Sequence, residues 1–383
     1  SINYQDRIYL NDSKGHFTKD ENALPNSFQS NSTVASVDID NDGDLDFFIG
    51  ARLTPRAYPN IPESKILINN NGKFEENHNA HISKLGMVTD AIWQDLDNDG
   101  WQDLIVVGEW MEISVFKNKE GQLEPMNISW VDENNHKIDT KGWWNCIAAA
   151  DFDKDGDIDF MFGNQGINGF MKPTQTEPIY MYKKDFDLNG SLDPVLAQYF
   201  DTKKGLELLP VHTRDDIMQQ LSVLQKKYHT YEDFANTNFK ELLNIKDLKL
   251  ETLHATIFEN MYAENLGNGS FKLIPLPKAC QVAPINDILI DDFDGDGQLD
   301  AVLVGNDFSS ETHYGRYDAL TGIFLKGNGF FFDVVPSRAS GFYVPKQANH
   351  IIKVKDQTNR TMLFTPQNNG NMRVFTSREG NKK

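Results

Sequence analysis

Short apolar runs with strand character recur along this chain of 383 residues, and each is bounded by a tight polar turn. Val34–Val37 precedes one such turn and Phe47–Ile49 follows it, while Phe160–Gly163 follows a later one. Short β-prone runs bounded by Gly, Asn and Asp are typical of strands, so the pattern predicts strands joined by turns. No apolar run approaches the ~18 residues that a membrane-spanning helix needs.

The turns between these strands carry acidic residues at alternate positions. Residues 151–159 read Asp-Phe-Asp-Lys-Asp-Gly-Asp-Ile-Asp, with carboxylates at the odd positions and Gly at position 6. Carboxylates at positions 1, 3 and 5 can converge only if the chain turns sharply, and Gly at position 6 permits that turn. Position 7 can add its backbone carbonyl and position 9 a further carboxylate. Such a cage of oxygen atoms suits a hard cation, and above all calcium.

The pattern occurs five times, and the copies are numbered loops 1 to 5 in chain order. A single copy could be an ordinary solvated acidic turn, but five copies with Gly in the same register argue against that alternative. The predicted calcium ligands, with position 7 acting through its backbone carbonyl, are Asp38, Asp40, Asp42, Asp44 and Asp46 in loop 1; Asp95, Asp97, Asp99, Trp101 and Asp103 in loop 2; Asp151, Asp153, Asp155, Asp157 and Asp159 in loop 3; Asp185, Asp187, Asn189, Ser191 and Asp193 in loop 4; and Asp292, Asp294, Asp296, Gln298 and Asp300 in loop 5.

These loops differ from the EF-hand. That motif needs Glu at position 12 and a helix on each side. Position 12 is apolar in all five loops: Ile49, Val106, Phe162, Leu196 and Leu303. Position 2 is apolar as well in every copy. Each loop is therefore predicted to join two strands, with its apolar residues held in a core.

The unit D-x-D-x-[DN]-G-x-x-D followed by an apolar strand resembles the FG-GAP or VCBS repeat of integrin-α-like β-propellers. Residues 66–74, Ile-Leu-Ile-Asn-Asn-Asn-Gly-Lys-Phe, resemble the third and fourth strands of such a blade. Four further segments look like parts of large ASPIC/UnbV-like surface proteins of Bacteroidota-type bacteria: Gly142–Asn145, Gly163–Gly166, His212–Asp215 and Gly315–Asp318. The resemblance covers nearly the whole chain. It implies an all-β propeller with calcium-binding loops, outside the cytoplasm, at the cell surface or outer membrane.

Loop spacing predicts a single propeller domain over residues 1–383, with four-stranded blades and most simply seven of them. The first three loops begin 57 and 56 residues apart, as in a regular repeat. Blades are predicted over roughly 32–78 and 86–128, from Trp144, from Ile179, over 285–335 and, without metal, from Asn349. Because residues 1–20 have the pattern of half a blade, we expect the chain to continue upstream.

The regular spacing ends between loops 4 and 5, which begin 107 residues apart. Apolar residues there change to helical spacing, at Ile217, Leu221, Leu224 and Tyr228. Thr213 is expected to cap the first helix, with Asp216 at its third position. The sequence thus predicts a helical insertion over residues 205–255. It either packs on the flank of the propeller or docks a partner.

The net charge of −19 argues against a nucleic-acid partner. Five Ca²⁺ ions would bring it to −9. Without them, carboxylates would lie unneutralised a few ångströms apart, so we expect folding and calcium binding to be coupled. Extracellular calcium modules bind at roughly 10⁻⁴–10⁻³ M, which favours a location outside the cytoplasm. Of the two cysteines, Cys146 lies in the apolar run Cys146–Ala150 and is expected to be a buried thiol. A disulfide between Cys146 and Cys280 is not expected, since it would link distant blades.

A second set of candidate residues lies in segments between strands and blades, where propellers usually bind ligands. Aromatic faces beside amide and guanidinium groups suit sugars. The alternative is packing between blades by the Trp residues, with an internal ion pair between Arg316 and Asp318. The candidate ligand-binding residues are Trp110, Trp143, Trp144, Asn164, Asn168, Arg316, Tyr317 and Asp318.

Signals for catalysis are weak. The sequence contains no G-x-S-x-G, H-E-x-x-H or phosphate-loop motif. It favours a non-catalytic, calcium-stabilised binding or scaffold protein whose ligand is a protein or a surface glycan. Membrane association would then run through other proteins or upstream segments. The second class is a calcium-dependent carbohydrate-active enzyme, similar to propeller-shaped polysaccharide lyases.

Overall fold

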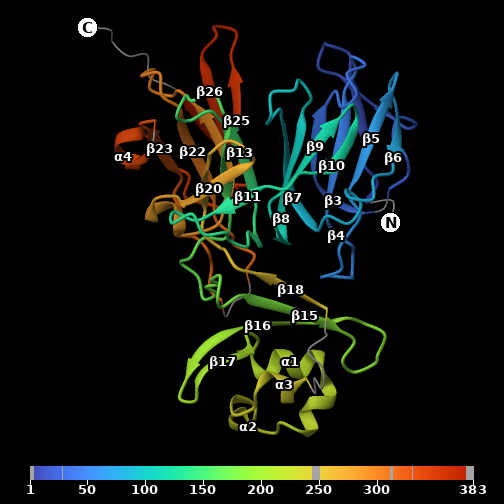
Figure 1. Ribbon diagram of the computed structural model, residues 1–383, viewed down its shortest axis with the longest axis vertical. Coiled ribbons are helices and arrows are strands. Elements are labelled where there is room, and N and C mark those ends of the chain that lie inside the picture. The colour runs from blue at the N-terminus through green and yellow to red at the C-terminus, as the bar shows by residue number, and fades with distance from the viewer. Residues whose placement is uncertain (1–3, 28, 244–250, 311–313, 330, 377–383) are drawn as a thin grey trace.

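The computed structural model describes residues 4–27, 29–243, 251–310, 314–329 and 331–376, and most of its regular structure is β-strand. The upper part of the molecule in Figure 1 consists of sheets set side by side. A smaller part lies beneath them, and it contains a sheet and most of the helices. In the described part of the chain, no helix has the length and apolar character needed to cross a bilayer.

Four of the upper sheets contain four antiparallel strands that follow one another in space, and we call them blades 1 to 4. Their first strands lie next to each other in the order β3, β7, β13, β21, as the inner strands of a propeller do. Blade 1 comprises β3 (Ser30–Val37), β4 (Asp46–Leu53), β5 (Lys65–Asn70) and β6 (Lys73–Asn77); blade 2, β7 (Met87–Gln94), β8 (Asp103–Met111), β9 (Ser114–Lys119) and β10 (Gln122–Pro125); blade 3, β13 (Cys146–Ala150), β14 (Asp159–Gly163), β19 (Met261–Asn265) and β20 (Ser270–Pro275); blade 4, β21 (Ile285–Asp291), β22 (Asp300–Gly305), β23 (Ile323–Gly327) and β24 (Phe332–Val335).

The remaining upper strands form smaller units. They are the hairpin β1 (Ile8–Asn11) and β2 (Phe17–Asp20), the sheet β25 (Ile352–Lys355), β26 (Thr361–Thr365) and β27 (Arg373–Thr376), and two added strands, β11 (Ser129–Val131) beside β20 and β12 (Gly142–Trp143) beside β8. Among the described residues, the two terminal sheets do not pair with each other. The strands described here therefore do not complete the predicted ring of seven blades.

Blade 3 is interrupted between its second and third strands. β14 pairs directly with β19, so residues 164–260 leave the blade and return to it. They form an inserted module with its own sheet, in the order β17-β16-β15-β18. Its elements are β15 (Ile179–Lys184), β16 (Asp193–Thr202), β17 (Gly205–Pro210), α1 (Arg214–Gln220), η2 (Ser222–Lys226), α2 (Tyr231–Ala235), α3 (Phe239–Leu242) and β18 (Thr252–Ala255).

The prediction of a fourth blade from Ile179 is therefore wrong, because these strands pair within the inserted module. The insertion is also longer than the predicted 205–255, since the hairpin that carries loop 4 precedes the helices. The physical reason is that an acidic turn between two apolar strands has the same sequence pattern in a propeller blade and in the inserted module. Only the pairing of β14 with β19, which are far apart in sequence, separates the two arrangements.

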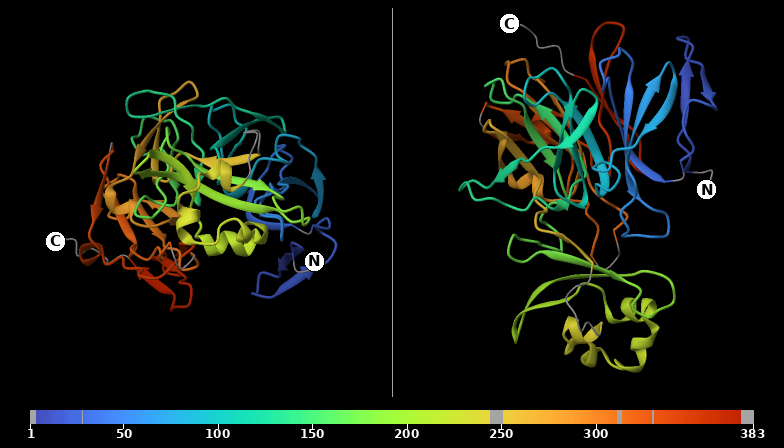
Figure 2. Two further views of the ribbon diagram at one scale, coloured as in Figure 1. Left: turned by 90° about the horizontal axis from the view of Figure 1, so that it is seen from below. Right: turned by 45° about the vertical axis from the view of Figure 1, so that its right-hand side comes forward.

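The inserted module has two apolar faces. The helices cover one face of its sheet, where Tyr182 and Val195 pack against Ile217, Leu221 and other helical residues. The opposite face packs against residues of the propeller, including Met87 and Trp110. Figure 1 and the right-hand view of Figure 2 place the sheet between the helices and the blades.

The helices begin as expected from the sequence. Thr213 caps α1 and accepts a hydrogen bond from the Asp216 backbone N–H, while the Asp216 carboxylate accepts one from the Thr213 N–H. Thr230 and Asp233 form the same reciprocal pair at α2. Each such box satisfies two backbone donors that a helix start leaves unpaired.

Apolar clusters fill the spaces between neighbouring blades. One joins blades 1 and 2, another blades 2 and 3, and a third blades 3 and 4. Both cysteines lie in the third cluster, as buried free thiols. The prediction of a buried thiol at Cys146 is thus confirmed. The 3-10 helix η3 (Lys278–Gln281) lies between blades 3 and 4, and the short α4 (Ser337–Ser340) lies between blade 4 and β25.

Hydrogen bonds at bulges also tie adjacent blades together. The pairing of β7 with β8 shifts between Val88 and Asp90, and the Asp90 carboxylate accepts from the Ile147 N–H of blade 3 at 3.0 Å. Asp287 follows a similar shift in β21 and accepts from the Ile351 N–H at 2.7 Å. Each carboxylate satisfies a backbone donor of the next sheet, so the two act as clamps between sheets.

The Asp90 clamp should make stability depend on pH. Burial raises the pKa of Asp90 to about 6, from an ordinary value near 4. The folded state therefore binds this proton more tightly than the unfolded state, so stability falls as pH rises from about 4 to 6. When the pH is lowered from 7 to 5, protonation of Asp90 should raise the free energy of unfolding by about 1 kcal/mol. Asp90→Asn should remove that gain.

The measurement is urea unfolding at pH 5 and pH 7 in EDTA, for wild type and Asp90→Asn. The stability difference between the two proteins should change by about 1 kcal/mol between the two pH values. Asp333→Asn, at an exposed position of β24, is the control and should follow wild type. An Asp90→Asn difference that is the same at both pH values would show that this carboxylate does not titrate in the window.

Candidate metal centres in five aspartate loops

Each aspartate loop joins the first and second strands of a hairpin. Loops 1, 2, 3 and 5 belong to blades 1, 2, 3 and 4, and loop 4 joins β15 to β16 in the inserted module. Neighbouring blade loops touch: the Lys154 ammonium in loop 3 donates to the Gly297 carbonyl in loop 5 at 2.5 Å. The Asn118 amide of blade 2 donates to the Ile39 carbonyl in loop 1 at 2.9 Å. The blade loops therefore lie at one end of the blades.

The glycine at position 6 is needed for its backbone conformation. All five have φ between 88° and 98°, a left-handed region that side chains disfavour. A Cβ added at any of them would meet no atom within 4 Å, so crowding is not the reason. Position 4 is left-handed as well, in Asn41, Asn98, Lys154, Leu188 and Gly295. Two left-handed residues thus shape each turn, within which three carboxylates converge.

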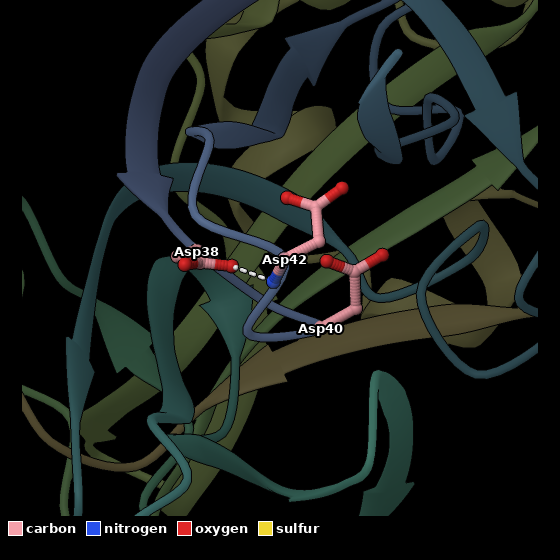
Figure 3. Close-up of side chains that lie close together, drawn as sticks. All are labelled: Asp38, Asp40 and Asp42. Carbon is pink, nitrogen blue, oxygen red and sulfur yellow. Dashed lines mark hydrogen bonds between the residues drawn. The ribbon is translucent and has the colours of Figure 1, made fainter. Parts of the chain in front are cut away.

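Backbone N–H groups hold the inward carboxylates in place. In loop 1, Asp38 accepts from the N–H of Asp42 and of Gly43, both at 3.0 Å, and Asp42 accepts from the Asp44 N–H at 3.0 Å. Figure 3 shows the bond from Asp42 to Asp38 and the neighbouring Asp40. The other loops repeat the bond from Gly at position 6 to Asp at position 1. These carboxylates are therefore oriented by the loop itself.

Carboxylate oxygens converge in all five loops. Within each group, one oxygen from each of three aspartates lies within 4.8 Å of the others. The groups are Asp38, Asp40 and Asp42; Asp95, Asp97 and Asp99; Asp151, Asp153 and Asp155; Asp185, Asp187 and Asp193; and Asp292, Asp294 and Asp300. Three of the five predicted residues thus lie together in each loop; the third is position 5 in loops 1 to 3 and position 9 in loops 4 and 5. The donor atoms are all oxygens, and such a set could hold a hard cation.

The aspartate at position 9 also accepts hydrogen bonds from the loop and from the strands behind it. In loop 3, Asp159 is 2% exposed and accepts from the Phe152 N–H at 3.3 Å, the Asn265 N–H at 2.8 Å and the Tyr262 hydroxyl at 2.7 Å. The same carboxylate in the other loops is also buried and accepts from the position 2 N–H: Asp46, Asp103, Asp193 and Asp300. This residue therefore fastens the loop to the strands behind it.

Charge is concentrated and partly buried in these loops. Burial raises the pKa of Asp103 and of Asp159 to about 6. Burial and then the neighbouring Asp42 raise the pKa of Asp44, while burial and then Asp155 raise that of Asp153. One carboxylate oxygen of Asp44 and one of Asp151 are buried without a hydrogen-bond partner. Unpaired buried oxygens beside other carboxylates fit a site for a cation.

Loops 2 and 5 contain a feature that sequence reasoning missed. The Lys117 ammonium in β9 contacts Asp97 and lies 2.8 Å from Asp99. Lys326 in β23 contacts Asp294 and lies 2.7 Å from Asp296. Hydrogen bonds to the lysines lower the pKa of Asp99 and of Asp296. The available signal was a lysine in the second half of the third strand, which only these two of the four blades contain.

The aromatic and polar candidates do not form one surface. Trp144 and Asn164 are fully buried in and beside blade 3. The Trp144 indole N–H donates to the Thr140 carbonyl at 2.9 Å, and the Asn164 amide donates to the Ile257 carbonyl at 3.1 Å. Both side chains thus have structural partners.

Trp110 and Trp143 pack between blade 2 and the inserted module. Their rings meet edge to face at 4.9 Å, and Trp143 also packs on Phe258 at 4.6 Å. The Trp110 indole N–H donates to the Tyr58 hydroxyl, which donates in turn to Glu109. The geometry of this pair favours the packing alternative over an open sugar platform.

The last candidates lie near blade 4. Tyr317 is buried and pairs with Asp307 through the backbone, while Arg316, Asp318 and Asn168 are exposed. The Arg316 guanidinium lies over the aromatic ring of Phe308, 4.1 Å from its centroid. The Asn168 amide donates to the Val282 carbonyl at 3.2 Å.

Comparison with known proteins identifies the repeat. A family model described as FG-GAP-like repeat matches residues 1–49 and 95–162, which contain loops 1, 2 and 3. The chain is thus an all-β protein that carries FG-GAP-like repeats. No curated protein sequence matches it.

Solved structures give more distant likenesses. A lectin of Agrocybe aegerita that recognises non-reducing terminal N-acetylglucosamine has 13% identity and a TM-score of 0.34, with 98% of this chain and 89% of that chain covered. An endo-arabinase of Bacteroides thetaiotaomicron has 8% identity and a TM-score of 0.31, with 92% and 94% covered. The Vibrio cholerae biofilm matrix protein Bap1 has 10% identity and a TM-score of 0.30, with 91% and 77% covered. Scores below 0.5 assign neither ligand nor activity to this chain.

Proposed function

We propose that this chain is a calcium-stabilised, non-catalytic binding or scaffold protein that acts outside the cytoplasm, at the bacterial cell surface or outer membrane. The observation that carries the proposal is the convergence of three carboxylates in each of five loops. The resemblance to VCBS-repeat surface proteins supplies the location, and the FG-GAP-like repeats agree with it.

Calcium is the cation that suits these loops best. It takes six to eight oxygen ligands at flexible geometry, whereas magnesium demands a tight octahedron. Side-chain oxygens at positions 1, 3 and 5 and the carbonyl at position 7 would supply part of this set, and water the rest. When bound, calcium would neutralise the converging carboxylates. Its role is then structural, since it holds the tips of the hairpins that the aspartates at position 9 fasten from behind.

The inserted module is the element that we assign to binding. It is absent from the other three blades, so the fold of a blade does not require it. Its helices bury one side against their own sheet and leave large apolar groups outside, with Val223 56% and Tyr231 63% exposed. Insertions in repeat folds commonly carry binding. The ligand is a partner protein or a surface glycan of the same membrane.

Capture from native outer membranes tests this proposal. The tagged wild-type chain in millimolar calcium should retain a partner, and Val223→Ser with Tyr231→Ser should lose it while the calcium-dependent melting transition stays. Phe17→Ser is the matched control, because Phe17 is 63% exposed on the distant β1–β2 hairpin. Retention of the partner by the double variant would contradict the assignment of binding to the module. Absence of any retained protein or glycan would contradict the binding role itself.

A further inference from the structure

The five loops differ in one respect that their own sequences do not show. In loops 2 and 5 a lysine from the third strand of the blade lies among the carboxylates. Lys117 contacts Asp97 and Asp99, and Lys326 contacts Asp294 and Asp296. These are the carboxylates at positions 3 and 5, which a calcium ion in the loop would need.

The two lysines occupy the same place in their blades. In each blade, the backbone N–H at the end of the third strand donates to the aspartate at position 9: the donors are Asn69, Asn118, Asn265 and Gly327. The residues just before these donors are Ile68, Lys117, Glu264 and Lys326. Blades 2 and 4 therefore direct an ammonium at the loop, blade 1 has an apolar residue there and blade 3 a carboxylate.

Loops 1 and 3 show the complementary feature. The two carboxylate oxygens that are buried without a partner, among the described residues, belong to Asp44 of loop 1 and Asp151 of loop 3. Glu264, the blade 3 equivalent of the lysines, is paired with Lys272 at 2.9 Å and brings no positive charge to the loop. These loops thus hold carboxylates that no side-chain cation neutralises.

We infer that Lys117 and Lys326 are internal cations that compete with calcium, so that the loops form two classes. This inference rests on the proposed calcium binding. Loops 1 and 3 take calcium at low concentration. Loops 2 and 5 are held by their own lysines, and calcium enters them only at higher concentration, when it displaces the ammonium.

The chemistry of lysine suits this role. Its ammonium is a compact charge with three donors on a flexible four-carbon stem, so it can bridge two carboxylates and can also withdraw to solvent. A single positive charge neutralises less than Ca²⁺ does, and it brings no coordination geometry. Loops 2 and 5 would therefore stay closed when calcium is scarce, and the blades that carry them would depend less on the ion than blades 1 and 3.

Replacement of the lysines by methionine tests the competition. Methionine keeps an apolar stem of similar length and removes the charge. Lys117→Met, Lys326→Met and the double variant are compared with Lys119→Met, a control on the same strand whose ammonium pairs with Glu124 outside the loop. Calorimetric titration with calcium should find the same number of tight ions in wild type and the control, including those of loops 1 and 3, with one more in each single variant and two more in the double variant. The added sites should bind about tenfold tighter than the same loops of wild type.

Terbium luminescence isolates loop 2. Trp101 occupies position 7 of that loop alone, so Tb³⁺ bound there should emit on excitation of the indole. Lys117→Met should show the emission at a lower Tb³⁺ concentration than wild type, and Trp101→Phe in the same background should remove most of it. Five equal calcium sites in wild type, unchanged by the lysine substitutions, would overturn the inference and leave the proposed function standing. Absence of bound calcium from wild type and all variants would overturn both.

Discussion

Removal of calcium with EDTA should lower the melting temperature of this chain by roughly 5–10 °C relative to 2 mM calcium. An ion that binds only the folded state stabilises it by mass action. At ten times the dissociation constant this amounts to about 1.4 kcal/mol for each occupied loop. Without the ion, converging carboxylates repel each other, and the buried Asp44 and Asp151 oxygens have no partner. Thermal unfolding followed by circular dichroism measures the shift.

Two controls make this result specific. Magnesium at the same concentration should restore much less stability, because it dehydrates reluctantly and needs octahedral geometry. Asp153→Ala removes position 3 of loop 3 and should abolish only that loop's share of the calcium effect, while Asp333→Ala on exposed β24 should leave the shift intact. Equal melting temperatures in EDTA and calcium would show that the loops are ordinary acidic turns.

Asp159→Ala should destabilise the chain by about 3–5 kcal/mol, and it should do so with or without calcium. The carboxylate is 2% exposed and accepts from two backbone N–H groups and from Tyr262. Its removal leaves three buried donors unsatisfied, and each costs about 1–3 kcal/mol before the structure relaxes. Urea unfolding in EDTA and in calcium gives the two free energies.

Asp155→Ala is the matched comparison in the same loop. Its carboxylate accepts one N–H, from Asp157 at 2.9 Å, and is exposed. Asp155→Ala should lower the free energy of unfolding in calcium and change it little in EDTA. If Asp159→Ala behaved in the same way as Asp155→Ala, position 9 would be a metal ligand only, and its assignment as the residue that fastens the loop would fail.

Local pattern was enough to predict the hairpins. Alternate carboxylates, the Gly at position 6 and the apolar position 2 predict the loop geometry, and the structure places these groups together. The cap of α1 by Thr213 follows from the same kind of local rule. Such features depend on residues within one or two turns of chain, so sequence alone carries them.

Long-range pairing was beyond that reasoning. The hairpin of loop 4 looks like a blade in sequence, yet β14 pairs with β19 across the whole inserted module. Lys117 and Lys326 reach their loops from the third strand, and Asp159 meets Asn265 from another part of the chain. Likewise Trp144 and Asn164 look like a ligand surface in sequence, but distant residues bury them. Each of these contacts depends on a fold that the local pattern does not determine.

Anomalous X-ray diffraction from crystals grown in millimolar calcium tests the central claim most directly. In these crystals we expect calcium in loops 1 and 3, ligated by side chains at positions 1, 3 and 5. In crystals grown at low calcium we expect the ammonium groups of Lys117 and Lys326 in loops 2 and 5. Loops 1 and 3 without an ion under these conditions would contradict it.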